Sequence, residues 1–379
     1  MANVASAANM ANGGKQVVVL VGTNKGAFVF HADAERRAWR RTGPHLGGWE
    51  VYSLLGLADN ARHAPRLLAA TSHMAYGATI RVSDDLGETW TQMPGSPRYA
   101  GTSGSVVKRI WHLARGAPSQ PDTLYAGVED AGLFVSHDRG ESWQELGGLT
   151  RHPTRPYWQP GGGGLCLHSI AVDPGHPRRL WVGISAAGVF RSDDGGQTWT
   201  VCNDGLPPAP AGHPYPEVGR CVHKLALDPR DADTLYVQQH GGVYKSTNGG
   251  RSWTRIEQGL PSAFGFPIAV TPTGDLFVVP LEGDEARYMV EGKLRVYRSR
   301  DGGQTWAATG SGLPQHPSYV SVLRDALAVD SLDPPGIYFG TTAGELFSST
   351  DAGDTWQALP GKYSRIMAVQ AWAFKSPGG

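Results

Sequence analysis

Short apolar runs alternate with polar turns along the whole chain, at lengths typical of β-strands. In the segment that starts at His168, apolar runs at 169–172, 180–184 and 188–192 are separated by Asp-Pro-Gly and Ala-Ala-Gly turns. Runs of this length, bounded by turn residues and rich in β-branched and aromatic side chains, predict strands. A fourth strand is expected to begin at Trp199, so the segment predicts one four-stranded antiparallel unit.

This unit repeats, and an octet of the form Ser-x-Asp-x-Gly-x-Thr-Trp marks each copy. The octets start at Ser83, Ser136, Ser192, Ser246, Ser299 and Ser349, so neighbouring starts lie between 50 and 56 residues apart. A repeat of this period predicts a propeller or a related array, because one unit alone cannot bury both of its faces.

Each residue of the octet has a structural explanation. The Asp, such as Asp85, is expected to accept hydrogen bonds from backbone N–H groups two residues further on and to fix a tight turn. The Gly supplies a backbone conformation with positive φ. The Trp starts the next strand and buries a large ring between units. We therefore assign the octets to the fold and look for the functional site elsewhere.

A seventh unit is split between the two ends of the chain. Residues 17–39 contain a second and a third strand, an eroded turn and Trp39 in the anchor position, but no first strand. Residues 364–372 resemble the first strands of the other units. We predict an all-β, seven-bladed β-propeller of four-stranded antiparallel blades over residues 16–375, closed by its C-terminal strand. Residues 1–15 are expected to be a disordered leader and 376–379 a tail.

The octets resemble the Asp-box (BNR) repeat of sialidases, sortilin-type receptors, two-propeller xyloglucanases and the photosystem II assembly factor. The resemblance covers the chain after the leader and implies the propeller fold, which hosts enzymes and binding proteins alike. The chain lacks the Arg-Ile-Pro motif of the sialidases, so a sialidase activity is not expected. The resemblance to the xyloglucanases implies two propellers with a carboxylate in each, whereas this chain has room for one.

The composition of the chain limits the kinds of partner that we expect. The formal net charge of zero gives no reason to expect a nucleic-acid or membrane partner. No apolar run reaches the length of a membrane span, and the N-terminus lacks the features of a signal peptide. Three cysteines are too few for a disulfide framework, and we expect a cytoplasmic protein.

The candidate catalytic residues lie near the start of the innermost strands. Counting back five residues from the turn that ends each strand gives Arg365, Tyr52 or Ser53, His112, His168, His223, Phe266 and Asp325. A packing position would hold Val, Ile or Leu. Cys166 and Cys221 precede His168 and His223 by two residues, on the same strand face. Because Cys and His ligate borderline divalent metals, His112, His168 and His223 are candidate ligands of a transition metal. Duplication, core packing and hydrogen bonding to carbonyl groups are the alternative explanations of these residues.

Loops on the same face supply candidate ligand-binding residues. The loop at 280–293 carries Glu282 and Arg287 and is long enough to act as a lid, and the connection before Cys166 offers Arg155. The full set of predicted ligand-binding residues is Lys25, His73, Tyr76, Glu129, Tyr157, Trp158, His240 and Arg324.

Two functions remain open. In the first, the channel mouth is the active site of a hydrolase or lyase for a polar, anionic or sugar-like small molecule. There the histidines act as base or metal ligands, Asp325 orients them, and Arg365 or Arg324 holds the anion. In the second, the face is a non-catalytic platform that binds a protein or a glycan through exposed aromatic residues such as Tyr157.

Overall fold

The structure is a computed structural model that describes residues 14–375, apart from 58–63, 100–105, 210 and 316. Residues 1–13 of the predicted leader and the predicted tail 376–379 lie outside the described residues, and Lys15 already begins the first strand. The described chain consists of β-strands and two short 3-10 helices, η2 (Arg155–Tyr157) and η3 (Val290–Gly292). The predicted all-β class is therefore confirmed. No helix in these described ranges has the length and apolar character needed to cross a membrane.

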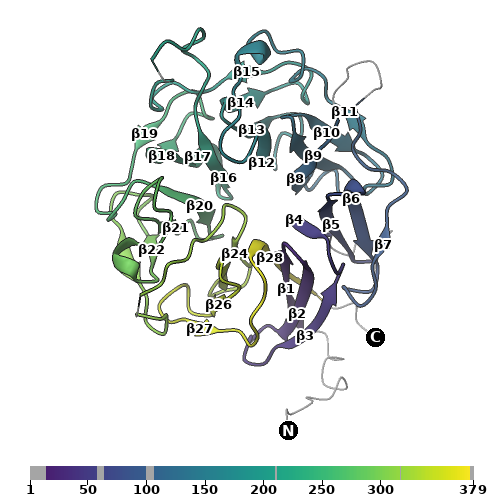
Figure 1. Cartoon of the computed structure of the whole chain (residues 1–379), viewed down its shortest axis with the longest axis vertical. Coiled ribbons are helices and arrows are strands. Elements are labelled where there is room, and N and C mark those ends of the chain that lie inside the picture. Colours follow the sequence, from purple (N-terminus) through teal and green to yellow (C-terminus); the bar gives the residue numbers. More distant parts are fainter. Residues whose placement is uncertain (1–13, 58–63, 100–105, 210, 316, 376–379) are drawn as a thin grey trace.

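The strands form antiparallel sheets that lie around a central axis (Figure 1). Four of these sheets each contain four strands that follow one another in the chain. They are β4 (Glu50–Leu57), β5 (Arg66–His73), β6 (Gly77–Ser83) and β7 (Thr91–Gln92); β16 (Val222–Asp228), β17 (Asp231–Gln239), β18 (Gly242–Ser246) and β19 (Thr254–Arg255); β20 (Gly265–Val270), β21 (Leu276–Pro280), β22 (Val296–Ser299) and β23 (Ala307–Thr309); and β24 (Leu327–Val329), β25 (Ile337–Gly340), β26 (Leu346–Ser349) and β27 (Gln357–Ala358).

Two further groups of four strands are joined into one eight-stranded sheet by a single residue pair, Glu129 with Cys166. The joined strands are β8 (Arg109–Arg115), β9 (Leu124–Glu129), β10 (Leu133–Ser136), β11 (Gln144–Glu145), β12 (Cys166–Val172), β13 (Leu180–Ser185), β14 (Gly188–Ser192) and β15 (Thr200–Val201). The first strand of each group lies nearest the axis in Figure 1.

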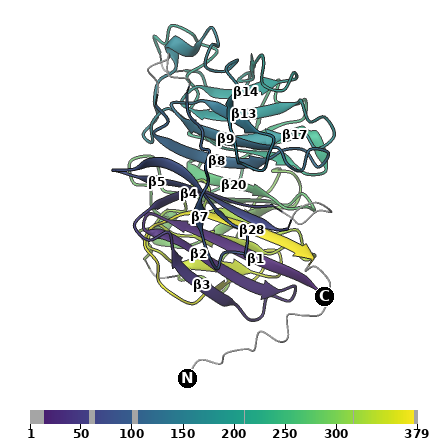
Figure 2. The ribbon, with the colours of Figure 1, turned by 90° about the vertical axis from the view of Figure 1, so that its right-hand side faces the viewer.

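The remaining sheet joins the two ends of the described chain. Its order is β28 (Ile366–Lys375), β1 (Lys15–Thr23), β2 (Gly26–Asp33) and β3 (Arg40–His45). β28 runs antiparallel to β1, with Val19 opposite Ala371, and Figure 2 shows the two strands side by side. The pairing supplies the inner strand that the N-terminal segment lacks, as the sequence predicts.

The octet turns take the predicted role in the fold, with one difference. In the turn at Asp85, the carboxylate accepts hydrogen bonds from the backbone N–H and the hydroxyl of Thr89, four residues further on and not two. The Ser83 hydroxyl bonds Asp85 at 2.7 Å and accepts the N–H of Gly87 at 2.8 Å. The loop is therefore wider than a simple Asx turn, and the carboxylate sits at its centre.

The octet tryptophans connect neighbouring sheets in the second half of the chain. The indole N–H of Trp253 donates to the Cys202 carbonyl, and that of Trp306 donates to the Ile256 carbonyl. Both bonds join one octet unit to the preceding one, so the tryptophans hold neighbouring sheets together around the axis.

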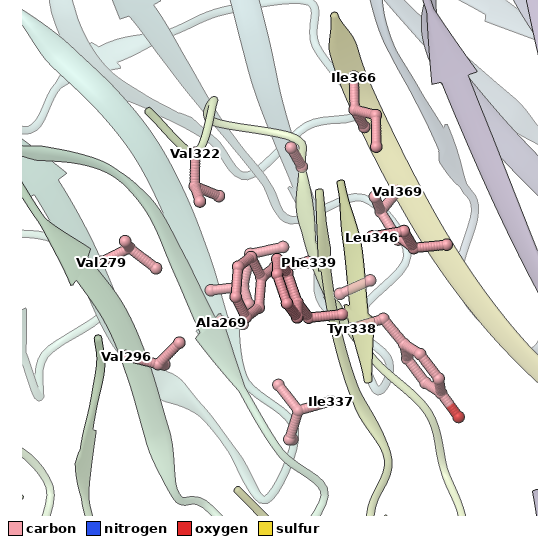
Figure 3. Close-up of a cluster of buried hydrophobic side chains, with 14 of the residues drawn as sticks. Ala269, Val279, Val296, Val322, Ile337, Tyr338, Phe339, Leu346, Ile366 and Val369 are labelled. Atoms are coloured by element: carbon pink, nitrogen blue, oxygen red, sulfur yellow. The ribbon is translucent and has the colours of Figure 1, made fainter. Parts of the chain in front are cut away.

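Apolar side chains of adjacent sheets interdigitate to form the core. Val279 of β21, Phe339 of β25 and Val369 of β28 belong to one buried cluster that spans three sheets (Figure 3). Fully burying an aliphatic or aromatic side chain contributes about 1.5–3 kcal/mol. Packing between the sheets therefore holds the inner strands in fixed positions, and these strands carry the candidate site.

Candidate functional site

A β-bulge near the start of the inner strands decides which side chains are equivalent. The pairing with the second strand skips one residue in each of four inner strands, and these residues are Tyr52, Trp111, His168 and His223. In β28 the skipped residue is Met367. A bulge adds one unpaired residue and turns its side chain.

The bulges correct two of the predicted equivalences. His112 is not the counterpart of His168 and His223, because it follows the bulge residue Trp111 and matches Ser169 and Lys224. Arg365 precedes the bulge residue Met367 by two positions, and it is exposed at the start of β28. The alignment of the inner strands was counted back from an Asp-Pro turn at the strand end. Neither β8 nor β28 ends in such a turn, so the predicted positions in these two strands were shifted.

His168 is part of the core. Its side chain is fully buried, and Nε2 lies 2.9 Å from the Val222 carbonyl while Nδ1 lies 3.0 Å from the Ser169 hydroxyl. Burial is the main cause that holds the pKa of His168 well below its usual value. Since both ring nitrogens are already bonded within the protein, the prediction that His168 is a metal ligand or base is wrong.

His223 is also buried, but only one of its nitrogens has a protein partner. Nδ1 lies 2.6 Å from the Gly265 carbonyl, so this nitrogen carries the proton and Nε2 is left as an acceptor. Burial, more than any other cause, lowers the pKa of His223 to about 3. The ring packs between Phe266, at 5.0 Å, and His240, at 5.4 Å between centroids.

His112 meets Asp325 and Lys224 near the axis. His112 Nδ1 lies 3.6 Å from Asp325 Oδ1, and Lys224 Nζ forms a short ion pair with the same oxygen. Burial raises the pKa of Asp325, but the charge of Lys224 and then His112 offset this, and the net pKa lies well below the usual range. Burial and Lys224 lower the pKa of His112. The three side chains form a compact cluster, in which Asp325 is paired with Lys224 and also lies beside His112, one of the histidines it was predicted to orient.

A cavity of about 520 Å³ opens beside this cluster, at the start of β16. Its lining combines an aromatic ring with polar and charged groups, among them Phe266, His223, His240, Asp284, Arg287 and Arg324. Asp284 lies 3.3 Å from His240 Nε2 and 2.5 Å from the Arg287 guanidinium. The Arg287 hydrogen bond is the largest of the causes that lower the pKa of Asp284. Pockets with an apolar wall and a few convergent charged groups are the usual form of a small-molecule site.

One group of side chains in the described ranges brings together three residues of types that can ligate a metal ion. The ligand atoms of Cys221, His223 and His240 lie within 4.8 Å of one another. The group shares only His223 with the predicted metal set. The proximity of Cys221 to His223 was expected from their spacing, whereas His240 was expected only as a loop residue.

The predicted loop residues separate into three kinds. His240, Arg324 and Arg287 line the cavity. Trp158 is buried in a core cluster and Glu129 is buried against Arg109, at 2.8 Å, so the ligand-binding roles predicted for these two are wrong. The others lie outside the cavity lining: Lys25 is exposed, Tyr157 packs on Tyr215, and His73 and Tyr76 stack with Trp49.

Sequence reasoning missed two charged residues of the region. Lys224 follows His223 directly and reaches Asp325 across 101 residues of sequence. Asp284 lies in the long loop whose Glu282 and Arg287 were selected. Lys224 was missed because the β-bulge at His223 could not be seen in the sequence. An unpaired residue shifts the inward-facing position of the strand by one.

The sequence matches the BNR/Asp-box repeat family at residues 190–201 and 297–308. These matches confirm the predicted resemblance to Asp-box proteins. The chain is also 30% identical over 163 residues to the oligoxyloglucan-reducing end-specific xyloglucanase of Emericella nidulans. That match covers 41% of this chain and 18% of the enzyme, so the chain spans about a fifth of the length of this relative.

Solved structures with a similar fold include enzymes and a peptide-binding protein. An ancestral GH74 enzyme superposes with a TM-score of 0.55 and 21% identity, over 83% of this chain and 39% of the enzyme. The structure titled YCF48 bound to D1 peptide superposes with a TM-score of 0.53 and 16% identity, over 83% and 85% of the two chains. At these identities the likeness extends to the fold alone.

Proposed function

We propose that the chain is a glycoside-hydrolase-like β-propeller that binds a polar, sugar-like or anionic small molecule in the cavity beside β16. We further propose that its sheets count as seven blades and that β28 closes the ring. The strand order supports this, because dividing the eight-stranded sheet at its single linking pair leaves seven groups of four. A closed propeller leaves only short, protected sheet edges.

The observation that carries the functional proposal is the composition of the cavity wall. Arg287 and Arg324 provide positive charge for a carboxylate or another anionic group, and Phe266 provides an apolar surface for a sugar ring. His240 beside Asp284 forms an imidazole–carboxylate pair at 3.3 Å. In such a pair the carboxylate orients the imidazole, and histidine is a common general acid–base residue.

The cavity differs from the common glycosidase arrangement, in which two carboxylates flank the bond that is cleaved. Asp284 is the one acidic residue among the described residues that line it. The reaction that this wall supports is therefore a hydrolysis or an elimination in which His240 transfers the proton. The partial match to xyloglucanases supports an oligosaccharide as the substrate class, and Arg287 and Arg324 suit one that carries an acidic group.

Binding and turnover of defined sugars would test this proposal. Xyloglucan oligosaccharides and uronic-acid oligosaccharides would be titrated into the full chain by calorimetry, and the release of reducing ends would be followed in parallel. We expect Arg287→Ala to weaken the binding of the anionic sugars by at least tenfold, since a charge-assisted hydrogen bond contributes about 1.5–3 kcal/mol. Tyr76→Ala, on a loop outside the cavity lining, is the matched control. The absence of both binding and turnover for all these sugars would contradict the proposal.

A non-catalytic platform is the second candidate, because one loop presents unusually exposed apolar side chains. Met74 is fully exposed and Tyr76 is 74% exposed, beside the rings of Trp49 and His73. Exposed aromatic patches mark interaction surfaces. Under this function Tyr76→Ala would abolish capture of a protein or glycan, whereas Arg287→Ala would leave it unchanged.

A further inference from the structure

We infer that Cys221, His223 and His240 form a binding site for a divalent transition metal of the zinc type. The inference concerns the cavity of the proposed function but does not require the proposed substrate. With a metal bound, His240 would act as its ligand, and a water in the fourth position would take over the proton transfer. It stands on the convergence of three ligand atoms, on the orientation of one buried imidazole and on the hydrogen bond that ties two of the ligands together.

The three residues come from two neighbouring strands that hold them in a fixed relation. Cys221 lies directly before β16, His223 lies within β16, and His240 follows the end of β17. The backbone N–H of His240 donates to the Cys221 carbonyl at 2.9 Å. Because this bond continues the pairing of the two strands, the packing of the sheet positions both ligands even without a metal.

The orientation of His223 is that of a metal ligand. Its Nδ1–H donates to the Gly265 carbonyl at 2.6 Å, which fixes the tautomer and leaves the Nε2 lone pair free. Metal-binding histidines almost always donate their other ring N–H to a carbonyl or a carboxylate. A histidine with a purely structural role has no need of a free nitrogen that faces a cysteine, and His168 shows the alternative with both nitrogens bonded.

The separation of the ligand atoms requires a small closure. Donors at zinc bond lengths of 2.0–2.3 Å in a tetrahedral site lie about 3.5 Å apart, compared with the upper limit of 4.8 Å here. The His240 side chain is 41% exposed and has room to rotate. Cys221 is only partly buried and makes one weak contact, at 3.6 Å, with the Ser185 hydroxyl.

The donor set selects the kind of ion. A thiolate with two imidazoles favours zinc-type ions over Mg²⁺ or Ca²⁺, which take oxygen ligands. The cavity lining contains no methionine within the described residues, so the axial thioether of a blue-copper site is not supplied. Three protein ligands leave a fourth position for water or for an oxygen of a substrate, which is the pattern of catalytic zinc sites. Arg287 and Arg324 disfavour the cation but favour an anionic fourth ligand.

Metal titration of the full chain tests the inference without any substrate. Protein stripped with a chelator would be titrated with Zn²⁺ against a chromophoric competitor, and with Co²⁺ while the absorption of the cobalt–thiolate bond is recorded. We expect one ion per chain and a thiolate band with Co²⁺. Cys221→Ser is expected to remove the band, and Cys221→Ser and His240→Ala are each expected to weaken Zn²⁺ binding by at least tenfold, the smallest loss typical even of residues that only orient ligands.

Two matched controls separate this site from general thiol and imidazole binding. Cys202→Ala removes a free cysteine of another site, and His176→Ala removes an exposed histidine that bonds Asp173. Both variants should bind Zn²⁺ as the unmodified chain does. No stoichiometric binding, or equal affinity in Cys221→Ser and the controls, would overturn the inference. A chain that binds sugars but not Zn²⁺ would refute the metal site while leaving the proposed function intact.

Discussion

The inner strands β12 and β16 start with nearly the same sequence, Cys-Leu-His-Ser and Cys-Val-His-Lys, yet they make different environments. In β12, His168 is closed into the core with both nitrogens bonded. In β16, His223 has one nitrogen free and faces a cavity. A repeated motif therefore does not imply a repeated function, because the residues around it decide what the histidine can do.

Two residue differences at equivalent positions accompany this difference. The residue opposite Cys166 in the β12 hairpin is Ser185, whereas the residue opposite Cys221 in the β16 hairpin is His240. After the histidine, β12 has Ser169, which bonds the ring of His168, whereas β16 has Lys224, which reaches away to Asp325. Ser169 bonds Nδ1 of His168 and the Val222 carbonyl bonds its Nε2, whereas His223 turns Nδ1 to the Gly265 carbonyl and leaves Nε2 without a partner.

The largest expected effect comes from Lys224→Met. Lys224 and Asp325 are 15% and 11% exposed, and removing one partner of a buried ion pair typically costs about 3–5 kcal/mol. The free energy of unfolding from urea denaturation measures this loss. Ser169→Ala, at the equivalent position of β12, should cost only about 1 kcal/mol. Equal losses of unfolding free energy in the two variants would contradict this distinction between the strands. Adding Asp325→Asn to Lys224→Met should restore part of the lost stability.

His168→Ala should follow in size. It leaves the Val222 carbonyl without its partner in a buried position, which costs about 1–3 kcal/mol, and it also creates a cavity. Its Zn²⁺ affinity should not change. Circular dichroism would show whether the His168→Ala variant is folded. A loss of metal binding in the folded variant would show that β12 and β16 share one site, and would contradict the difference drawn between them.

The octet turns of the same two sheets provide a test that depends on pH. Burial raises the pKa of Asp194, but hydrogen bonds from Thr198, Ser192 and Gln197 together lower it to about 2. A lowered carboxyl pKa contributes stability that is present above the usual value near 4 and lost as the pH falls toward 2. The β16 sheet has Asn248 at this position, which makes the same bond to Ser252 and does not titrate. Asp194→Asn should therefore flatten the dependence of unfolding free energy on pH between about 4 and 2.

The smallest effect on stability is expected for His240→Ala. Its side chain is 41% exposed, and substitutions at such positions usually stay within about 0.5 kcal/mol. Thermal unfolding without metal should be unchanged, while added Zn²⁺ should raise the melting temperature of the unmodified chain alone, because a ligand stabilises the state that binds it. Equal stabilisation of His240→Ala by Zn²⁺ would place the metal elsewhere.

The fold was largely predictable from the sequence, because its determinants are local and repeated. The octets fix turns, the apolar runs fix strands, and the likeness of residues 364–372 to other inner strands predicted the pairing of β28 with β1. The site was predicted only in part. His223, His240 and Arg324, selected from the sequence, line the cavity. The bulge at Trp111 moved His112 away from the position equivalent to His168 and His223, and the burial of Trp158 has no sequence signal. The contact of Lys224 with Asp325 depends on the sheets meeting at the axis, which no local pattern encodes.

The pairing of β28 with β1 also sets a time order for folding in the cell. β1 leaves the ribosome about 350 residues before β28, an interval of roughly 20 to 70 seconds at the usual rate of translation. During that interval the N-terminal sheet has one uncovered edge of backbone N–H and carbonyl groups. The nascent chain therefore passes through a long stage in which chaperone capture or strand exchange with a second copy competes with its own last strand.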